Sequence, residues 1–223
     1  MASVTTTRAA RPLDALHRFN AAHPWDHNAH YHPWLLRQVP RRFGTALDVG
    51  CGSGDLARLL ARRAREVHGI DADPDILARA RAATPGTARV RYSVADASRE
   101  LPAGRYDVIT CVAALHHLPL PGTLARFRRH LAPGGTLVVV GCARASGPAD
   151  HALALAAVPP NALLGWAKNR GRPAPHRPAA MTARTREPAE SFAEISRTAR
   201  RLLPGARLRR RLFWRYTLVW RAP

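Results

Sequence analysis

The sequence predicts an α/β fold: a doubly wound, mostly parallel sheet of seven strands, with a C-terminal antiparallel hairpin and an N-terminal helical cap. Two observations lead to this prediction. Between Ala46 and Gly141, short apolar segments alternate with segments of helical spacing, which indicates parallel strands joined by crossover helices. The first apolar segment runs directly into a glycine turn, as at the start of a nucleotide-binding unit. With 223 residues, 46% of them hydrophobic, the chain can fill one such core.

The glycine turn is the segment around which the rest of the chain is organised. Residues 46–54 read Ala-Leu-Asp-Val-Gly-Cys-Gly-Ser-Gly, and leucines at helical spacing follow. Glycine lets the backbone bend tightly and lets a ligand approach, and the free N–H groups that open the next helix face that ligand. A dinucleotide fingerprint would need glycine or alanine at position 55, which is Asp55. A carboxylate there would repel a pyrophosphate but not a cationic sulfonium, so the dinucleotide alternative fits poorly.

The string Leu-Asp-Val-Gly-Cys-Gly-Ser-Gly closely resembles motif I of class I S-adenosylmethionine (SAM)-dependent methyltransferases. The resemblance extends over about residues 40–142 and implies a Rossmann-like core with SAM as its cofactor. In the glycine turn it implies cofactor contacts for Asp48, Gly50, Cys51 and Gly52. The chain then divides into an N-terminal tail and helical lid (1–40), the SAM-binding core (41–142), an insertion that caps the substrate (143–190), and a C-terminal helix and hairpin that complete the sheet (191–223).

The second strand, Glu66–Asp71, ends in a carboxylate about twenty residues after the first glycine. An acid at this place can accept hydrogen bonds from both ribose hydroxyls of an adenosine ligand. Asp73 and Pro74 follow as the N-cap and the first residue of the next helix. We therefore expect Asp71 to hold the ribose, with Ala72 beside it. The alternative is an ordinary solvated carboxylate at a strand end.

The third strand, Arg89–Val94, leads into a turn that contains Asp96 and Ala97. The resemblance implies that this turn meets the adenine. The Asp96 carboxylate would accept from the exocyclic amine, and a neighbouring backbone N–H would reach the ring. An ordinary turn or cap residue is the alternative for Asp96.

The fourth strand, Tyr106–Val112, is mostly apolar, as a central parallel strand should be. We expect Val112 at the cofactor, and His116 and His117 follow in the next loop. Neutral imidazole can accept a proton near neutral pH, so these histidines are the candidate catalytic residues. Their Leu-His-His-Leu context resembles the fourth motif of small-molecule methyltransferases. It lacks the Asn/Asp-Pro-Pro-aromatic element of enzymes that methylate exocyclic amines of bases. Helix capping or packing is the alternative role for both.

Beyond this loop the pattern predicts a helix over 121–131, a Pro-Gly-Gly turn and a fifth strand over 136–141. In the insertion it predicts a helix over 152–158, broken by Pro159 and Pro160, and a proline-rich loop over 171–178. The resemblance implies that such insertions form the wall of the substrate site. The candidate wall residues, for which plain packing is the alternative, are Trp166, Met181 and Phe192.

The C-terminal region predicts a helix over 191–203 and two strands, 206–213 and 215–220, joined by a tight turn at Trp214. The side chains expected to face inward are Leu208, Leu212, Tyr216, Leu218 and Trp220. The hairpin also carries a cluster of basic residues, Arg207, Arg209, Arg210, Arg211 and Arg215. We interpret the cluster as a solvated edge that blocks strand aggregation. A nucleic-acid patch is the alternative.

Histidines and aromatic residues gather in the N-terminal cap. In the resembling enzymes this segment lies over cofactor and substrate, so the candidate lid and substrate residues are Trp25, His27, Asn28, Tyr31 and His32. His23, His27 and Tyr31 follow helical i, i+4 spacing, which would also suit a metal site. We favour an amphipathic cap instead, and expect no metal. Its packing residues would be Phe19, Trp34, Leu35 and Leu36.

The formal charge of +20 permits a nucleic acid or another acidic partner but does not demand one, because Lys168 is the only lysine and such an arginine bias can reflect a GC-rich genome. No apolar run reaches the length of a membrane span, and Met1–Pro12 lacks the apolar core of a secretory signal. We interpret Met1–Pro12 as a short disordered tail; because it contains arginine and no acid, a transit peptide is the alternative. The spacing of Cys51, Cys111 and Cys142 fits no metal clamp. Buried free thiols and a cytoplasmic location are expected.

These observations lead to one main hypothesis. The chain is expected to be an enzyme that transfers the methyl group of SAM to an oxygen, nitrogen or carbon of a small molecule, for instance in secondary metabolism, with His116 or His117 as base. One alternative is an RNA methyltransferase that uses the basic C-terminal region, where residues 182–223 hold 11 arginines and 3 acids. Another is a SAM-binding protein without catalysis.

Overall fold

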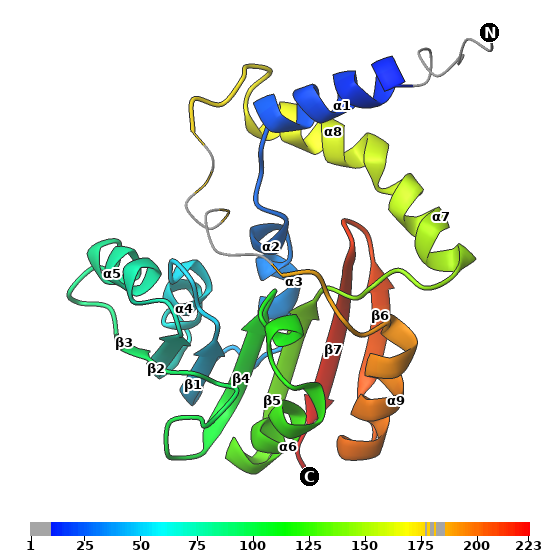
Figure 1. The fold of residues 1–223 in the computed structure, drawn as a ribbon. Coiled ribbons are helices and arrows are strands. Elements are labelled where there is room, and N and C mark those ends of the chain that lie inside the picture. The colour runs from blue at the N-terminus through cyan, green and yellow to red at the C-terminus, as the bar shows by residue number, and fades with distance from the viewer. Residues whose placement is uncertain (1–9, 177, 179–180, 182–185) are drawn as a thin grey trace, which may run out of the picture.

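The computed structural model describes residues 10–176, 178, 181 and 186–223, which form a seven-stranded sheet in the order β3-β2-β1-β4-β5-β7-β6 (Figure 1). The first five strands in sequence run parallel, and β7 is antiparallel to both β5 and β6. This confirms the predicted fold class. The strands are β1 (Phe43–Val49), β2 (Ala64–Asp71), β3 (Val90–Val94), β4 (Tyr106–Val112), β5 (Leu131–Gly141), β6 (Arg207–Arg211) and β7 (Arg215–Arg221).

Helices cover both faces of the sheet. Because successive side chains of a strand point to opposite faces, Leu47 joins a core with Phe127 and Ile195, while Ala46 joins a second core with Leu35 and Leu60. The helices are α1 (Ala10–Ala22), α2 (His27–His30), α3 (His32–Leu36), α4 (Asp55–Leu60), α5 (Pro74–Ala82), the 3₁₀ helix η1 (Leu115–His117), α6 (Leu120–His130), α7 (Pro148–Ala156), α8 (Val158–Lys168) and α9 (Phe192–Leu202).

The N-terminal helix and the insertion lie together beyond the ends of the strands. In Figure 1, α1 and α8 run side by side above the sheet, and the chain descends from α1 to α2 at the sheet itself. Asn161 of α8 joins the two segments, because its Oδ1 accepts hydrogen bonds from Trp25 Nε1 at 3.1 Å and His27 Nε2 at 2.7 Å. The cap is therefore assembled from two segments far apart in the sequence.

Three expected boundaries are wrong. The helix expected over 152–158 is α7, which begins at Pro148 and ends at Ala156, and Pro159 and Pro160 stand in the first turn of a new helix, α8, where a proline's missing N–H has no intrahelical partner to lose. His23 and His27 share no helix, since α1 ends at Ala22 and α2 begins at His27. Residues 10–12 of the expected tail belong to α1, and residues 1–9 lie outside the described part of the chain.

The hairpin departs from the expected alternation at its turn. Leu208 is half-buried, and Tyr216, Leu218 and Trp220 are buried as expected, but Leu212 is 39% exposed and Phe213 is buried in its place. The reason is that β6 ends at Arg211, after which Phe213 and Trp214 both adopt a φ of 57° in the left-handed region. Phe213 then packs against the ring of Trp25, with centroids 4.9 Å apart.

Candidate active site

A cavity of about 900 Å³ lies at the ends of β1, β2 and β4, where parallel α/β sheets hold their ligands. It is lined by all nine residues expected at the cofactor, which are Asp48, Gly50, Cys51, Gly52, Asp71, Ala72, Asp96, Ala97 and Val112. His116 and His117 line the same cavity.

No helix in the described ranges is long and apolar enough to cross a membrane.

The glycine turn forms one wall of the cavity. Gly50 and Gly52 have φ of +68° and +52°, a conformation that side-chain-bearing residues rarely adopt. A Cβ at Gly50 would overlap the Cβ of Ala114, whereas a Cβ at Gly52 would meet no atom within 4 Å. Gly50 is therefore needed for packing, and Gly52 leaves open the space into which a ligand can approach the backbone.

Asp71 is held in place by the loops on either side of it. Its Oδ2 accepts from the backbone N–H of Gly52 at 2.9 Å, and its Oδ1 accepts from that of Asp73 at 3.1 Å. Each carboxylate oxygen has a second lone pair, so both can still accept a hydrogen bond from a ligand. This geometry suits a pair of vicinal hydroxyls.

Asp48 is 2% exposed, and its two oxygens have different surroundings. Oδ1 accepts from Thr110 Oγ1 at 2.7 Å, while Oδ2 has no hydrogen-bond partner among the described residues. Burial raises the pKa of Asp48 to about 7, which the Thr110 hydrogen bond partly offsets. A buried acceptor without a partner favours a ligand that brings a donor or a positive charge. SAM, whose sulfonium and ammonium groups are cationic and whose ribose has two hydroxyls, fits these residues.

Asp96 is exposed at the rim of the cavity. Its Oδ1 accepts from the Ser98 N–H at 2.8 Å, and Oδ2 lies 3.4 Å from Arg99 Nε. The Ser98 hydrogen bonds lower the pKa of Asp96, so it is ionised at neutral pH. The carboxylate can thus stabilise its own turn and accept from a ligand.

His116 and His117 lie on η1, directly after β4, with ring centroids 4.1 Å apart. His116 Nδ1 is buried without a hydrogen-bond partner in the described structure. Burial, together with the nearby His117 and Arg215, lowers the pKa of His116 to about 4. Burial and Arg186 lower the pKa of His117, while Asp71 opposes them. Both rings are therefore neutral near pH 7.

The cap and the hairpin form another part of the cavity wall. His27, Asn28 and His32 line it, as expected, and so does Met181. Arg215 was expected in the solvated edge of the hairpin and not in the cavity. Arg215 instead lines the cavity, and its Nε and Nη2 donate to Asn28 Oδ1 at 3.1 and 2.9 Å. Strand order could have predicted this position, because the first residue of an antiparallel strand beside β5 must lie at the carboxyl end of β5.

Four expected acceptor residues do not line the cavity. Trp25 and Tyr31 are 4% and 7% exposed and belong to the second core, where Tyr31 donates its hydroxyl to the carbonyl of Leu212. Trp166 is 49% exposed on α8, and Phe192 packs under the guanidinium of Arg210. Phe192 thus has the packing role that is its alternative, and Trp25 and Tyr31 also serve packing. Phe19 also differs from the expected packing, since it stacks on His23.

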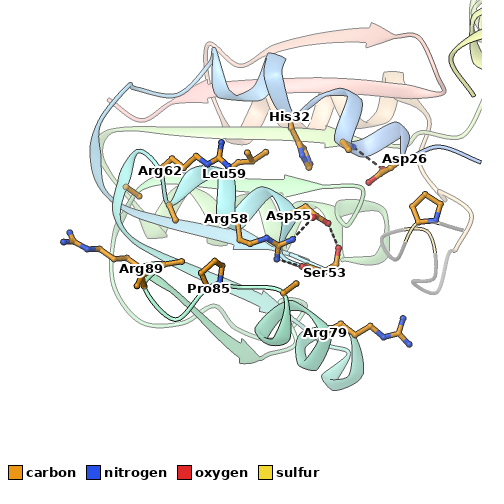
Figure 2. A pocket seen from close by; sticks show the side chains of 17 residues that line it. Asp26, His32, Ser53, Asp55, Arg58, Leu59, Arg62, Arg79, Pro85 and Arg89 are labelled. Carbon is orange, nitrogen blue, oxygen red and sulfur yellow. Dashed lines mark hydrogen bonds and ion pairs between the residues drawn. The ribbon is translucent and has the colours of Figure 1, made fainter. Parts of the chain in front are cut away.

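A second hollow, of about 980 Å³, lies beside the first and shares Asp26, His32, Ser53 and Asp55 with it. Figure 2 shows Asp55 between Ser53 and Arg58, with the Arg58 guanidinium 2.6 Å from the Asp55 carboxylate. Asp55, the acid at the mouth of the glycine turn, is thus paired with Arg58.

Within the described ranges, no group of three or more His, Cys, Asp or Glu residues could hold a metal ion.

Comparisons with known proteins agree with this geometry. The family described as methyltransferase domain matches residues 46–135. An uncharacterized methyltransferase of Mycobacterium tuberculosis is 35% identical over 90% of this chain and 98% of its own length. Trans-aconitate 2-methyltransferase of Streptomyces avermitilis is 38% identical over 50% of this chain and 45% of its own.

Among solved structures, the N-methyltransferase NodS of Bradyrhizobium japonicum, in complex with S-adenosyl-L-homocysteine (SAH), has the same fold. Its TM-score is 0.58 and its identity 19%, with 94% of this chain and 97% of NodS covered.

Proposed function

The chain belongs to the class I SAM-dependent methyltransferase family, and we propose that it methylates an oxygen, nitrogen or carbon nucleophile of a small molecule. One observation carries the proposal. A single cavity is lined both by the acidic residues at the ends of β1 and β2 and by the histidine pair after β4. Methyl donor and acceptor can therefore meet inside it. The similarity of about half of the chain to trans-aconitate 2-methyltransferase supports an acceptor of small size.

In this proposal the nine residues of the glycine turn, strand ends and rim hold the cofactor. Asp71, fixed by the Gly52 and Asp73 N–H groups, accepts from the ribose hydroxyls. Asp96 accepts from the adenine amine, and the unpartnered Oδ2 of Asp48 faces the cationic part of the ligand. Bound SAM supplies an electrophilic methyl group on a sulfonium.

His116 and His117 are proposed to hold the acceptor and to take a proton from it where the attacking atom carries one. Both rings are neutral near pH 7, so each has a nitrogen that can accept a hydrogen bond. A positioned base contributes about 10²- to 10⁴-fold to the rate. Since burial makes His116 a weak base, His117 is the better candidate for proton transfer and His116 for orientation.

The cap residues contribute by positioning. His27 and His32 line the cavity, and His27 is fixed by its hydrogen bond to Asn161. Holding two reactants at reacting distance can supply about 7 to 11 kcal/mol of the barrier reduction. A cap built from the N-terminal segment and α8 would provide this by covering the acceptor.

The proposal is tested in two steps on the full-length chain. Calorimetric titration with SAM and SAH is compared between the native protein and Asp71→Ala, with exposed Glu100→Ala as the matched control. We expect the Asp71 variant to lose at least about tenfold in affinity (about 1.4 kcal/mol) and the control to lose nothing. Transfer of labelled methyl groups is then screened over phenols, amines, carboxylic acids and enols. Binding without transfer to any acceptor would favour a non-catalytic SAM-binding protein.

A further inference from the structure

Arg215 is a cation on the cavity wall, and no carboxylate of the described residues forms an ion pair with it. It is half-buried at the first residue of β7. Its guanidinium donates to Asn28 Oδ1 and, at 3.3 and 3.5 Å, to the carbonyls of Phe213 and Trp214. All three acceptors are neutral. The ion pairs of the described chain involve other arginines, namely Arg58, Arg91, Arg99, Arg144 and Arg210.

A guanidinium withdrawn from water is costly unless an anion accompanies it. Its charge also reaches its neighbours. Burial lowers the pKa of His27 and His116 and Arg215 adds to that effect, while at Cys142 Arg215 opposes the rise in pKa that burial causes. These three residues, together with Asn28 and Arg215, define what we call the acceptor end of the cavity, and all five line it. When the histidines are neutral, the only charge on these five residues is that of the guanidinium. The acid beside them is Asp26, whose carboxylate caps α2 by accepting from the N–H groups of Asn28 and Ala29.

Acids gather at and just beyond the carboxyl ends of β1, β2 and β3, where Asp48, Asp71, Asp73, Asp75 and Asp96 line the cavity. Asp26 and Asp55 also line it, and Asp55 is paired with Arg58. Arg186 is a second cation on the cavity wall, close enough to His117 to lower its pKa. A cationic cofactor bound beside the acids and an anionic acceptor bound at the acceptor end would match these charges.

We infer that the methyl acceptor is a small carboxylic acid whose carboxylate binds Arg215 at the acceptor end of the cavity, an inference that rests on the proposed methyltransferase function. A planar guanidinium pairs with a carboxylate through two parallel N–H···O bonds, which fixes orientation as well as charge. Asn28 holds the side chain from the cap side, so the arginine is oriented before the acid binds. One guanidinium beside two neutral imidazoles matches one negative charge, which favours a carboxylate over a phosphate dianion.

The test measures binding to the SAH-loaded protein, so it does not depend on turnover. Benzoate, phenylacetate and succinate are titrated against benzamide, phenylacetamide and succinamide, with phenyl phosphate as a further probe. We expect at least one carboxylate to bind about tenfold or more tightly than its amide and more tightly than phenyl phosphate. The difference should shrink with added salt. Equal affinity of all acids and amides, or preference for the phosphate, would overturn the inference.

Variants assign the effect to Arg215. Arg215→Gln should remove the preference for the acid while leaving SAH affinity within about twofold. Arg215→Lys keeps the charge without the planar fork and should retain part of the preference. Exposed Arg207→Gln, on β6, is the control that should change nothing. If Arg215→Gln weakens SAH instead of the acid, the arginine serves the carboxylate of the cofactor and the inference is wrong. Failure of SAH to bind the native protein would instead refute the proposed function.

Discussion

The backbone N–H of Gly52 donates to Oδ2 of Asp71 at 2.9 Å, so the glycine turn holds the carboxylate at the end of the neighbouring strand. Two features that lie 19 residues apart in the sequence thus form one rigid edge of the cavity. The N–H of Asp73 fixes the other oxygen at 3.1 Å. Because the carboxylate is oriented before any ligand arrives, little further ordering is needed when hydroxyls bind it.

Substitution of the two cavity glycines should separate folding from binding. Gly52→Ala places a Cβ in open space, so we expect about 1 to 2 kcal/mol of lost stability from the left-handed conformation and at least about tenfold weaker SAH binding. Gly50→Ala adds an overlap with Ala114 and should destabilise the fold much more. Urea unfolding and SAH calorimetry measure both. Unchanged SAH affinity in Gly52→Ala would show that the ligand does not approach this part of the turn.

Asp48 should make the unliganded protein less stable as the pH rises. The pKa of Asp48 is about 7 in the folded protein, against 3.8 for the free side chain, so between these two pH values the folded state binds more protons than the unfolded state. The free energy of unfolding therefore falls as the pH rises through it and levels off above about 7. Asp48→Asn should remove this dependence, stabilise the free protein at about pH 8 and weaken SAM binding. Urea unfolding at about pH 5 and about pH 8 gives the comparison. An identical pH dependence in both proteins would contradict the raised pKa.

The core and the cofactor end of the cavity could be predicted because local patterns determine them. Strand β4 has the predicted bounds, Tyr106–Val112, since its apolar run is buried on both faces. Asp71 and Asp96 line the cavity because they follow strand ends, and the ends of parallel strands meet at one edge. Strand periodicity and turn position were sufficient for these residues.

The acceptor end could not be predicted in the same way. The sequence places Trp25 and Tyr31 in a cap but does not show whether an aromatic ring faces the cavity or the core, and both face the core. Arg215 stands in a run of arginines whose other members include the exposed Arg207 and Arg209, so composition alone suggested a solvated edge. Its place at the start of a strand antiparallel to β5 puts Arg215 at the carboxyl end of β5, but its contact with Asn28 of the cap is long-range and leaves no periodic signal.

Asn161 should control the acceptor end without affecting the cofactor end. Its Oδ1 accepts from His27 Nε2 and Trp25 Nε1, and Trp25 Nε1 also reaches the Asn161 carbonyl, which substitution retains. For Asn161→Ala we expect about 1 kcal/mol of lost stability and faster hydrogen exchange in residues 23–31. Acceptor KM should rise while SAH affinity is unchanged. A parallel loss of SAH affinity would show that the cap also supports the cofactor.

Because of the histidine pair, enzyme activity should persist at pH values well below the pKa of a free imidazole. His116 faces His117 and Arg215, and His117 faces Arg186 and Asp71; burial lowers the pKa of both, that of His116 to about 4. If a neutral ring is required, activity persists as the pH falls below 6.5 and is lost near the folded pKa. The free energy of unfolding also falls as the pH falls below 6.5, because these histidines take up a proton in the unfolded chain before they do so in the folded chain.

Replacing both histidines with alanine should lower kcat about 10²- to 10⁴-fold for an acceptor that must lose a proton. His117→Ala should account for most of this loss, and His116→Ala should chiefly raise KM. Unchanged turnover in the double variant across the pH range would exclude both residues from proton transfer.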